Sequence, residues 1–408
     1  GFGQAVKDIS MKGIFMEKSL KKDIIINRLP VVIYFILIFA ALMVIISAVA
    51  PMSNHEPKTT DTYSDFSTGW LNCEESEASL NHLSGTTVIH RTITAADCNK
   101  TLFFFAKTSN IKVFIDGVCQ YRNNHFCSQF FGKTPGALFV NVLIPAESDG
   151  KLLEIEIENP YKDDDSAKLD EMYIGDISDI IQFQQQKRFN SFCISFIIMV
   201  LGVVMLLLFI PLTRQKIVGI EFLNLGVTAF VSGLYLTTDG RYLQLVFGDA
   251  HIYHVIAETA LRLSILPFLI FLSQMYESYS KRISAILCVI GEIAFAGCFI
   301  GEITEIMDYH ETLFLVHVVF AISMLFILVS TIKGIVKAPK ENIYHNIGCI
   351  VLSFMAMTDI IILWRGTGRE TSYFIRLGIL IFFFMEIVQI IKKFLASYQR
   401  NIKNELLS

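Results

Sequence analysis

Charged residues are scarce in this chain. Asp, Glu, Lys and Arg make up 18% of its 408 residues, whereas 53% are hydrophobic, and the mean hydropathy is +0.52. A water-soluble domain has too little interior to hold that much apolar surface, but a lipid bilayer does not require it to be hidden. The net charge of −4 gives no basis for binding nucleic acid. The composition therefore excludes an ordinary soluble protein and favours one embedded in a lipid bilayer.

The short motifs of common catalytic and cofactor sites are also missing. The sequence contains no P-loop, histidine-kinase box, HExxH, G-x-S-x-G or C-x-x-C. The run Asp163–Asp165 offers oxygen ligands for calcium but lacks the glycine and the spacing of an EF-hand loop, which favours a solvated loop. We therefore expect these residues to form no enzyme and to hold no cofactor or metal.

Eight apolar runs are long enough, at about 20 residues, to cross a bilayer. The first is separated from the others by a long polar stretch, and the remaining seven follow one another closely. The runs are residues 29–50, 189–212, 217–236, 252–275, 283–300, 312–332, 343–363 and 373–391. This pattern predicts a single anchoring helix, a large insert and a bundle of seven helices. An uncleaved anchor is favoured over a signal peptide, because no convincing cleavage site follows the first run.

The distribution of positive charge orients the spans. Lys and Arg gather in the N-terminal tail, in alternate short loops and just after the last span, for example at Lys21, Arg214, Arg282, Lys337 and Lys392. With eight spans, all of these positions lie on one side, which the positive-inside rule assigns to the cytoplasm. Both termini are therefore expected in the cytoplasm and the insert outside.

The insert has the patterning of β-strands. Residues 152–158, LLEIEIE, alternate strictly between apolar and acidic side chains, as in a strand with one buried face. Residues 87–94, 103–121 and 137–145 add further strands, and Asp116-Gly117 is a two-residue hairpin turn because both positions tolerate positive φ. Several short strands with turn signals between them predict a β-sandwich.

The chain is thus expected to have five segments. They are a basic cytoplasmic tail (1–28), a transmembrane anchor (29–51), an extracellular β-sandwich (52–188), a seven-helix transmembrane domain (189–392) and the start of a cytoplasmic helix (393–408).

A series of short motifs in this order carries a family resemblance. The motifs are DFSTGW (65–70), the strand and hairpin block 103–121, GALFVNVLIP (136–145), LEIEIENPY (153–161) and MYIGDI (172–177), followed by the seven helices. Over roughly residues 60 to 400, the chain resembles the bacterial seven-transmembrane receptors with diverse intracellular signalling modules. In particular, it resembles the clostridial members that continue into a GGDEF diguanylate cyclase domain.

The resemblance implies a receptor in a bacterial plasma membrane. It implies a jelly-roll ectodomain similar to carbohydrate-binding modules and a small-molecule or sugar ligand. The sequence departs from the family in one respect, since no GGDEF string or other output module occurs within the 408 residues. We therefore expect the last residues to be the truncated start of a signalling helix, with the output module following in cis or recruited in trans.

Aromatic side chains of the insert are the candidates for ligand contact, because aromatic faces stack on sugar rings. The candidates are Trp70, Tyr121, Phe126, Phe130 and Phe131. The alternative is that these rings fill the sandwich core or pack at its edge.

Four cysteines of the insert lie on the side where disulfides form. They are Cys73, Cys98, Cys119 and Cys127, and of these Cys119 and Cys127 flank a short loop and make the easiest pair. An anaerobic host would leave them as thiols.

Ionisable residues inside the spans are costly, at about 2.5–3.5 kcal/mol each, and normally pair or face a cavity. Glu258 and Arg262 are four residues apart on one helix and share a face. By depth, Asp359, Arg365 and Arg376 lie in the same outer half of the bundle. We expect a polar cluster that relays the state of the ectodomain or binds an anion, or else a structural ion-pair network.

The exit from the last span predicts a dimer contact. Ile391, Leu395, Tyr398 and Ile402 are spaced by four, three and four residues, as in the seam of a parallel coiled coil. A short amphipathic segment on the membrane surface has the same spacing.

Three functions fit these observations. We favour a homodimeric signalling receptor that contacts the lipid bilayer, a small-molecule or carbohydrate ligand and a cytoplasmic signalling module. A transporter or channel is the second, although only Pro267 interrupts the centre of a span and no internal repeat is evident. A membrane-anchored adhesion module is the third, but it leaves seven helices unexplained.

Overall fold

The computed structural model describes residues 62–123, 136–161, 167–214, 218–275, 278–337, 342–364 and 372–407. The described residues up to 325 belong to one compact unit, and those from 326 to 407 belong to a second. The predicted anchor at 29–50 and the acidic run at 163–165 lie outside the described residues.

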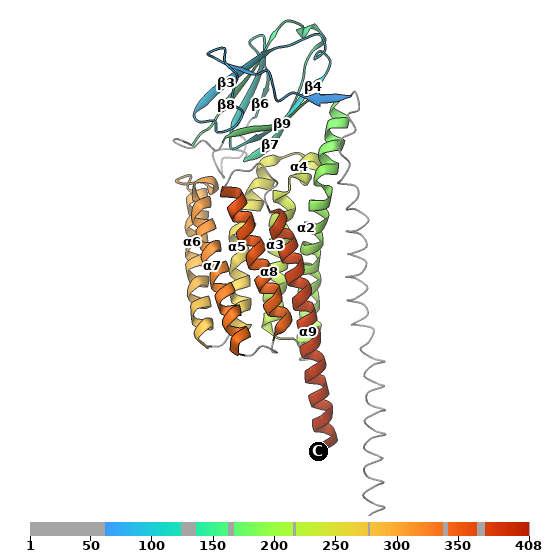
Figure 1. Cartoon of the computed structure of the whole chain (residues 1–408), viewed down its shortest axis with the longest axis vertical. Coiled ribbons are helices and arrows are strands. Elements are labelled where there is room, and N and C mark those ends of the chain that lie inside the picture. The colour runs from blue at the N-terminus through green and yellow to red at the C-terminus, as the bar shows by residue number, and fades with distance from the viewer. Residues whose placement is uncertain are drawn as a thin grey trace, which may run out of the picture. The chain divides into compact units, whose positions relative to one another are not determined.

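The β region, residues 62–175, contains two antiparallel sheets (Figure 1). The four-stranded sheet has the order β1 (Tyr63–Asp65), β9 (Lys168–Gly175), β4 (Thr101–Lys107) and β7 (Ala137–Leu143). The five-stranded sheet has the order β2 (Leu71–Asn72), β3 (Thr86–Thr92), β8 (Leu152–Glu158), β5 (Asn110–Ile115) and β6 (Val118–Arg122). Most neighbours in the sheets are distant in sequence, so the chain crosses repeatedly between them.

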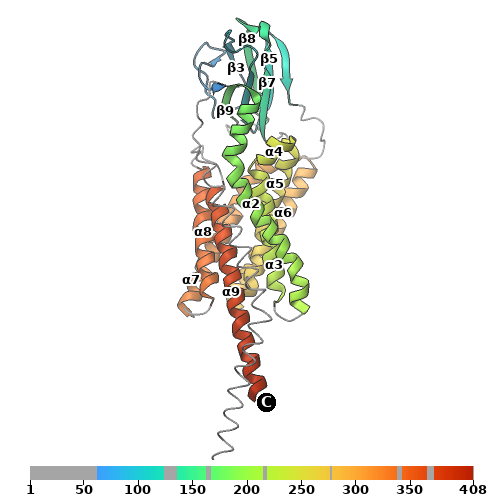
Figure 2. The same cartoon turned by 90° about the vertical axis from the view of Figure 1, so that its right-hand side faces the viewer.

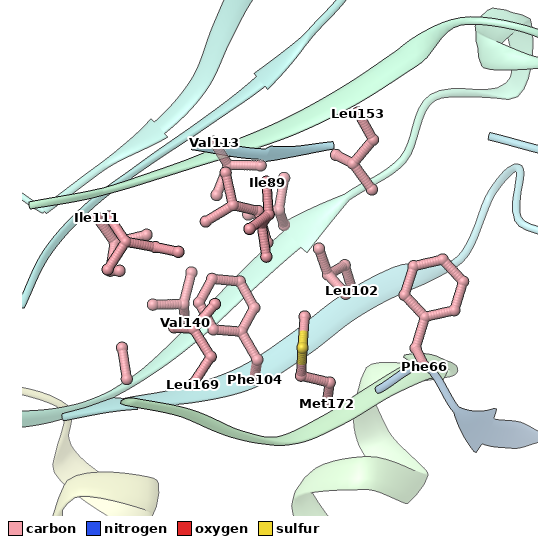
Figure 3. Close-up of a cluster of buried hydrophobic side chains, with 14 of the residues drawn as sticks. Phe66, Ile89, Leu102, Phe104, Ile111, Val113, Val140, Leu153, Leu169 and Met172 are labelled. Carbon is pink, nitrogen blue, oxygen red and sulfur yellow. The ribbon is translucent and has the colours of Figure 1, made fainter. Parts of the chain in front are cut away.

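The alternation of β8 is confirmed. Leu153, Ile155 and Ile157 have no exposed surface, whereas the glutamates between them face outward. These three side chains meet residues from the other sheet, including Phe104 and Val140, in one hydrophobic core. Figure 3 shows labelled side chains from both sheets pointing toward one another across this core.

Eight helices follow the β region within the described residues (Figures 1 and 2). They are α2 (Ile177–Arg214), α3 (Ile220–Asp239), α4 (Tyr242–Phe247), α5 (Ala250–Met275), α6 (Ser278–Ile303), α7 (Tyr309–Lys337), α8 (Ile343–Trp364) and α9 (Tyr373–Leu407). All except α4 are long and apolar enough to cross a membrane. The seven closely spaced runs of the sequence are thus seven helices, which indicates a multi-pass membrane protein.

Helix α2 begins well before the membrane-spanning run that predicts it. It starts at Ile177, directly after β9 ends at Gly175, whereas the apolar run begins at residue 189. The residues between them, which the sequence assigns to the end of the insert, are helical. The four-stranded sheet therefore leads straight into a 38-residue helix without a loop.

Close backbone contact holds α2 against α3. A side chain at Gly233 would place its Cβ 2.3 Å from the backbone nitrogen of Met199, and one at Gly202 would lie equally close to that of Phe230. Small residues at these crossings let two helices approach to backbone contact, as is common in membrane bundles.

The predicted hairpin turn between β5 and β6 is confirmed, and it provides a test of the fold. Asp116 and Gly117 have φ values of 52° and 76°, and Ile115 pairs with Val118. Space is open around Gly117, so a methyl group there meets no atom and only the left-handed conformation is penalised. We predict that Gly117→Ala destabilises the hairpin by about 1 kcal/mol.

Hydrogen exchange of the β5 and β6 amides measures this effect. Protection is expected to fall in Gly117→Ala and to stay unchanged in the matched variant Asp116→Asn, because Asn tolerates positive φ at least as well as Asp. Equal protection in Gly117→Ala and the wild-type chain would contradict the assigned turn.

Candidate functional site

The second face of the four-stranded sheet carries aromatic rings that lie outside the shared core. Phe103 and Phe105 are 1% and 4% exposed, yet they are not part of the core cluster, which holds Leu102 and Phe104 from the same strand. Phe139 on β7 stacks on Phe103, with 5.4 Å between ring centroids. Strand β4 is therefore buried on both faces, and its continuous apolar run is the sequence signal for this. Figures 1 and 2 show this sheet beside α4 and the start of α2.

Helix α4 covers part of this aromatic face. Oriented to satisfy both of its polar atoms, the Gln244 amide donates to the Ala137 carbonyl at 3.3 Å and accepts from the Phe139 N–H at 2.9 Å. Arg241, just before α4, adopts a φ of 61° and holds its guanidinium carbon 4.0 Å from the centroid of the Phe105 ring. The short helix is thus joined to the sheet by hydrogen bonds between the Gln244 side chain and the main chain of β7, and by a cation–π contact.

An ion-pair cluster joins β9 to α2. Strand β9 has one extra residue opposite β4 between the pairs Phe103–Tyr173 and Phe105–Asp170, and Glu171 in this bulge has a φ of 51°. The bulge turns the Glu171 carboxylate toward α2, because an extra residue re-aims the side chain of a strand. Both Glu171 oxygens accept hydrogen bonds from Arg188, at 2.7 and 2.9 Å, and Lys187 lies 2.9 Å away.

Electrostatics fix the charge state of Glu171. Burial alone would raise its pKa, but Arg188 and Lys187 outweigh this effect and lower the pKa to about 2. The Glu171 and Arg188 side chains are 16% and 5% exposed, so water screens the pair only weakly. The carboxylate therefore remains charged at neutral pH and holds α2 to the sheet.

A second polar contact joins the β region to the start of α7. The Tyr161 hydroxyl donates to Asp308 Oδ2, and the rings of Tyr161 and His310 lie 4.4 Å apart. Asp308 also accepts from the N–H groups of His310 and Glu311 at 2.8 and 3.2 Å, while the Glu311 carboxylate accepts from the Asp308 N–H at 2.9 Å. This reciprocal pattern is a capping box, so Tyr161 binds the residue that begins α7.

Behind this cap, Arg262 ties α5 to α7. Arg262 is 3% exposed and donates from Nη1 to Glu258 Oε2 at 2.6 Å. Its Nη2 donates to the Tyr309 carbonyl at 2.7 Å and to the Thr312 hydroxyl at 3.1 Å. Thr259 and Tyr309 share a further hydrogen bond of 3.1 Å. Glu258 and Arg262, which the sequence places on one helix face, form an ion pair, and Arg262 also holds the first turn of α7.

Glu302, near the end of α6, adds an unusual acid to this region. Its side chain is 2% exposed, and its Oε2 has no hydrogen-bond partner among the described residues. Its carboxylate accepts a hydrogen bond from the Tyr309 N–H, which links the end of α6 to the start of α7.

Other ionisable positions of the sequence lie in the second unit. Asp359 accepts from the N–H groups of Phe374 and Ile375, at 3.3 and 2.6 Å, and so caps the start of α9. Arg376 is 2% exposed, and Arg365 lies outside the described residues. The convergence of Asp359, Arg365 and Arg376 with Glu258 and Arg262 stays a prediction.

Glu386 on α9 pairs with a residue that sequence inspection does not single out. Its Oε1 lies 2.5 Å from His345 Nδ1 on α8, and both side chains are 2% exposed. The Cys349 thiol lies 3.6 Å from His345 Nε2. This contact joins α8 to α9 deep within the second unit.

The aromatic ligand candidates fall in different places. Trp70 is 1% exposed in the core, donates to the Phe66 carbonyl at 2.8 Å and offers no open face to a ligand. The structure thus places it as a packing residue, the alternative that the sequence leaves open. Tyr121 is partly buried beside a cavity at the aromatic face, and Phe126, Phe130 and Phe131 lie outside the described residues.

The remaining candidates stay predictions. Cys119 is exposed, but Cys127 lies outside the described residues, so their disulfide is not tested. Within the described part of the chain, no group of three or more His, Cys, Asp or Glu residues is placed to hold a metal. The seam positions Ile391, Leu395, Tyr398 and Ile402 all lie on α9, which stays helical through Leu407.

Sequence reasoning misses the residues that connect the two parts of the first unit. Tyr161, Glu171 and Arg188 carry no motif that identifies them, because their roles depend on a bulge and on a contact between distant segments. Asp308 is the exception, since Asp308 and Glu311 have the spacing of a capping box just before an apolar run.

Comparison of the chain with protein-family models, with curated proteins and with solved structures finds no match.

The Glu171 cluster generates a pH prediction. We expect Glu171→Gln to lower the free energy of unfolding by roughly 3 kcal/mol at neutral pH, because the variant loses a charge that Arg188 and Lys187 stabilise. A lowered folded-state pKa contributes stability fully above the ordinary value of 4.5, and this contribution is lost as the pH falls toward about 2. The difference between wild type and variant should shrink over that range.

Unfolding of the detergent-solubilised chain at a series of pH values measures this difference. Glu158→Gln on the exposed end of β8 is the matched control, and it should change stability little at any pH. A wild-type advantage over Glu171→Gln that persists unchanged at pH about 2 would refute the assigned pairing.

Proposed function

We propose that this chain is the sensor part of a transmembrane signalling receptor. In this proposal the two sheets form a jelly-roll-like sandwich outside a bacterial plasma membrane, both termini are cytoplasmic, and the sandwich senses a small molecule or carbohydrate. The seven-helix bundle relays to a cytoplasmic output module in cis or in trans, of which a GGDEF diguanylate cyclase is the favoured kind. The sensor part does not itself form an enzyme.

The observation that carries the proposal is the direct attachment of the β region to the helices. Tyr161 binds the cap of α7, and Glu171 binds Arg188 on α2. A domain that only adheres to a surface needs no buried polar contact with several membrane helices. A sensor does, because a ligand changes a distant site only through groups that differ between two packed arrangements.

The polar contacts continue from the cap into the bundle. Asp308 caps the start of α7, and Arg262 on α5 donates to the Tyr309 carbonyl in the first turn of α7 while pairing with Glu258. Any displacement of Tyr161 acts on Asp308, and the first turn of α7 cannot shift without stretching the Arg262 hydrogen bonds. Ligand binding to the β region would thus change the packing of α5 against α7.

Helix α9 is suited to carry the output. It is a single helix of 35 residues from Tyr373 to Leu407, or about 50 Å at 1.5 Å per residue. A helix of that length extends beyond the thickness of a bilayer, which is about 30 Å. Its predicted seam at Ile391, Leu395, Tyr398 and Ile402 would pair two copies of the chain, and a change in the packing of that pair would switch an attached module.

A transporter receives less support from the helices. Transporters commonly bind substrate where spans are broken at the middle of the membrane. The seven spans of the described residues are continuous, and Pro267 lies within an unbroken α5.

We predict that loss of the Tyr161 hydroxyl alters the dimer contact of α9. In membranes, Leu395→Cys should form a disulfide between two copies, and adding Tyr161→Phe should change its rate because the cap of α7 loses a buried hydrogen bond. The rate is measured by oxidising the full chain and separating monomer from dimer.

Two controls accompany this measurement. The wild-type chain, without Leu395→Cys, reports cross-linking through the eight native cysteines. Tyr253→Phe on α5 removes a phenol hydroxyl that none of the contacts above uses, and it should leave the rate unchanged. Failure of Leu395→Cys to cross-link would exclude this dimer, and equal rates with and without Tyr161→Phe would exclude the relay.

A further inference from the structure

A cavity of about 260 Å³ lies at the aromatic face of the four-stranded sheet. Phe103, Phe139 and Tyr121 contribute aromatic rings to its wall, and Leu245 on α4 adds an aliphatic one. Asn141 on β7 and Asp249 just before α5 add polar groups. Its lining therefore comes from both the β region and the helices that follow it.

The polar groups of this cavity are not all used by the protein. The Gln244 amide, which also lines it, is occupied by the backbone of β7. The Asn141 amide and the Tyr121 hydroxyl, in contrast, have no hydrogen-bond partner within the described part of the chain. Asp249 Oδ1 accepts from the Ile252 N–H at 3.2 Å, which leaves Oδ2 for another donor. The cavity thus offers an amide, a hydroxyl and a carboxylate oxygen beside aromatic rings.

The charges around the cavity select for a neutral ligand. The guanidinium carbon of Arg188 lies 4.9 Å from the centroid of the Phe139 ring, which lines the cavity. This guanidinium occupies a face of the Phe139 ring that would otherwise attract a ligand cation, and its charge would repel the cation. An anion would be repelled by the Asp249 carboxylate, which lines the cavity.

We propose that this cavity binds a neutral, hydroxylated ring of monosaccharide or cyclitol size. One C–H face of such a ring packs on Leu245 and on the partly exposed Phe139 ring, and its hydroxyls donate to Asp249 and exchange hydrogen bonds with Asn141 and Tyr121. The volume suits a ligand of this size, since larger drug-like ligands occupy about 300–1,000 Å³. The proposal rests on the proposed receptor function and assigns a binding site to the ligand of that receptor.

This location has a mechanical consequence. A ligand on the outer surface of the sheets would have to act through the whole β region. A ligand in this cavity touches β4 and β7 on one side and α4 and the start of α5 on the other. Ligand binding therefore acts directly on the spacing between the sheet and the helices.

Ligand-observed NMR with the detergent-solubilised full chain tests the proposal. The probes are D-glucose, D-galactose, N-acetyl-D-glucosamine and myo-inositol, each titrated at millimolar concentration. We expect at least one probe to bind saturably, and Asn141→Trp, which fills the cavity, to weaken that binding by roughly tenfold or more. Leu143→Trp is the matched control, because Leu143 lies two residues along the same strand, is 62% exposed and does not line the cavity.

Smaller substitutions test the site even if Asn141→Trp does not fold. Asn141→Leu keeps the size of the side chain and removes only its amide, and Asp249→Asn keeps the hydrogen bond to Ile252 but removes the charge. Both should weaken the same probe, and Tyr121→Phe should do so to a smaller extent. Probe affinity unchanged in Asn141→Trp and Asn141→Leu would overturn the site, and no binding of any probe to the wild-type chain would overturn the ligand class.

The experiments distinguish failure of the receptor function from failure of the proposed binding site. If a probe binds in the cavity but leaves the Leu395→Cys cross-linking rate unchanged, the site stands and the relay to α9 is wrong. If a probe alters cross-linking equally in the wild-type and Asn141→Trp backgrounds, the receptor stands and the ligand binds elsewhere.

Discussion

The burial of β4 on both faces is the constraint on which the first unit depends. Leu102 and Phe104 fill the core between the sheets, whereas Phe103 and Phe105 face away from it and are equally hidden. Burying one phenylalanine ring stabilises a fold by about 1.5–3 kcal/mol, so Phe103, Phe105 and Phe139 together account for several kcal/mol. Without the helices these rings would meet water. Separating the β region from α2 and α4 would therefore remove this part of its stabilisation.

Aromatic packing alone does not fix how the sheet sits on the helices, because apolar contact is not directional. The polar contacts supply that direction. Arg188 donates from Nη2 to both oxygens of Glu171, and Tyr161 donates to the residue that caps α7, so each contact requires particular positions of sheet and helix. Buried ion pairs contribute little net stability compared with apolar residues of the same shape, but breaking one is costly. Their value here lies in selecting one arrangement of sheet and helices and in making other arrangements unfavourable.

Periodicity in the sequence predicts the elements well and the connections between them poorly. The seven closely spaced spans, the alternation of β8 and the turn at Asp116-Gly117 all follow from local rules, and the structure contains each of them. Trp70 shows the limit of such rules, because a lone aromatic residue suits a binding platform and a core equally, and only packing against Phe66 places it inside. Glu171 shows it again, since its role arises from a bulge that no residue pattern marks.

The start of α2 changes how a signal would have to travel. A span that begins at residue 189 implies a linker after β9, and a linker can absorb motion. The structure instead continues β9 into a helix at Ile177, and Arg188, eleven residues along it, is held by Glu171 on that same strand. A helix fixed at two points to one sheet cannot bend freely between them. Any movement of the four-stranded sheet would thus displace α2 with it. Since Gly202 and Gly233 bring α2 and α3 into backbone contact, that displacement must be shared with α3 or must break their packing.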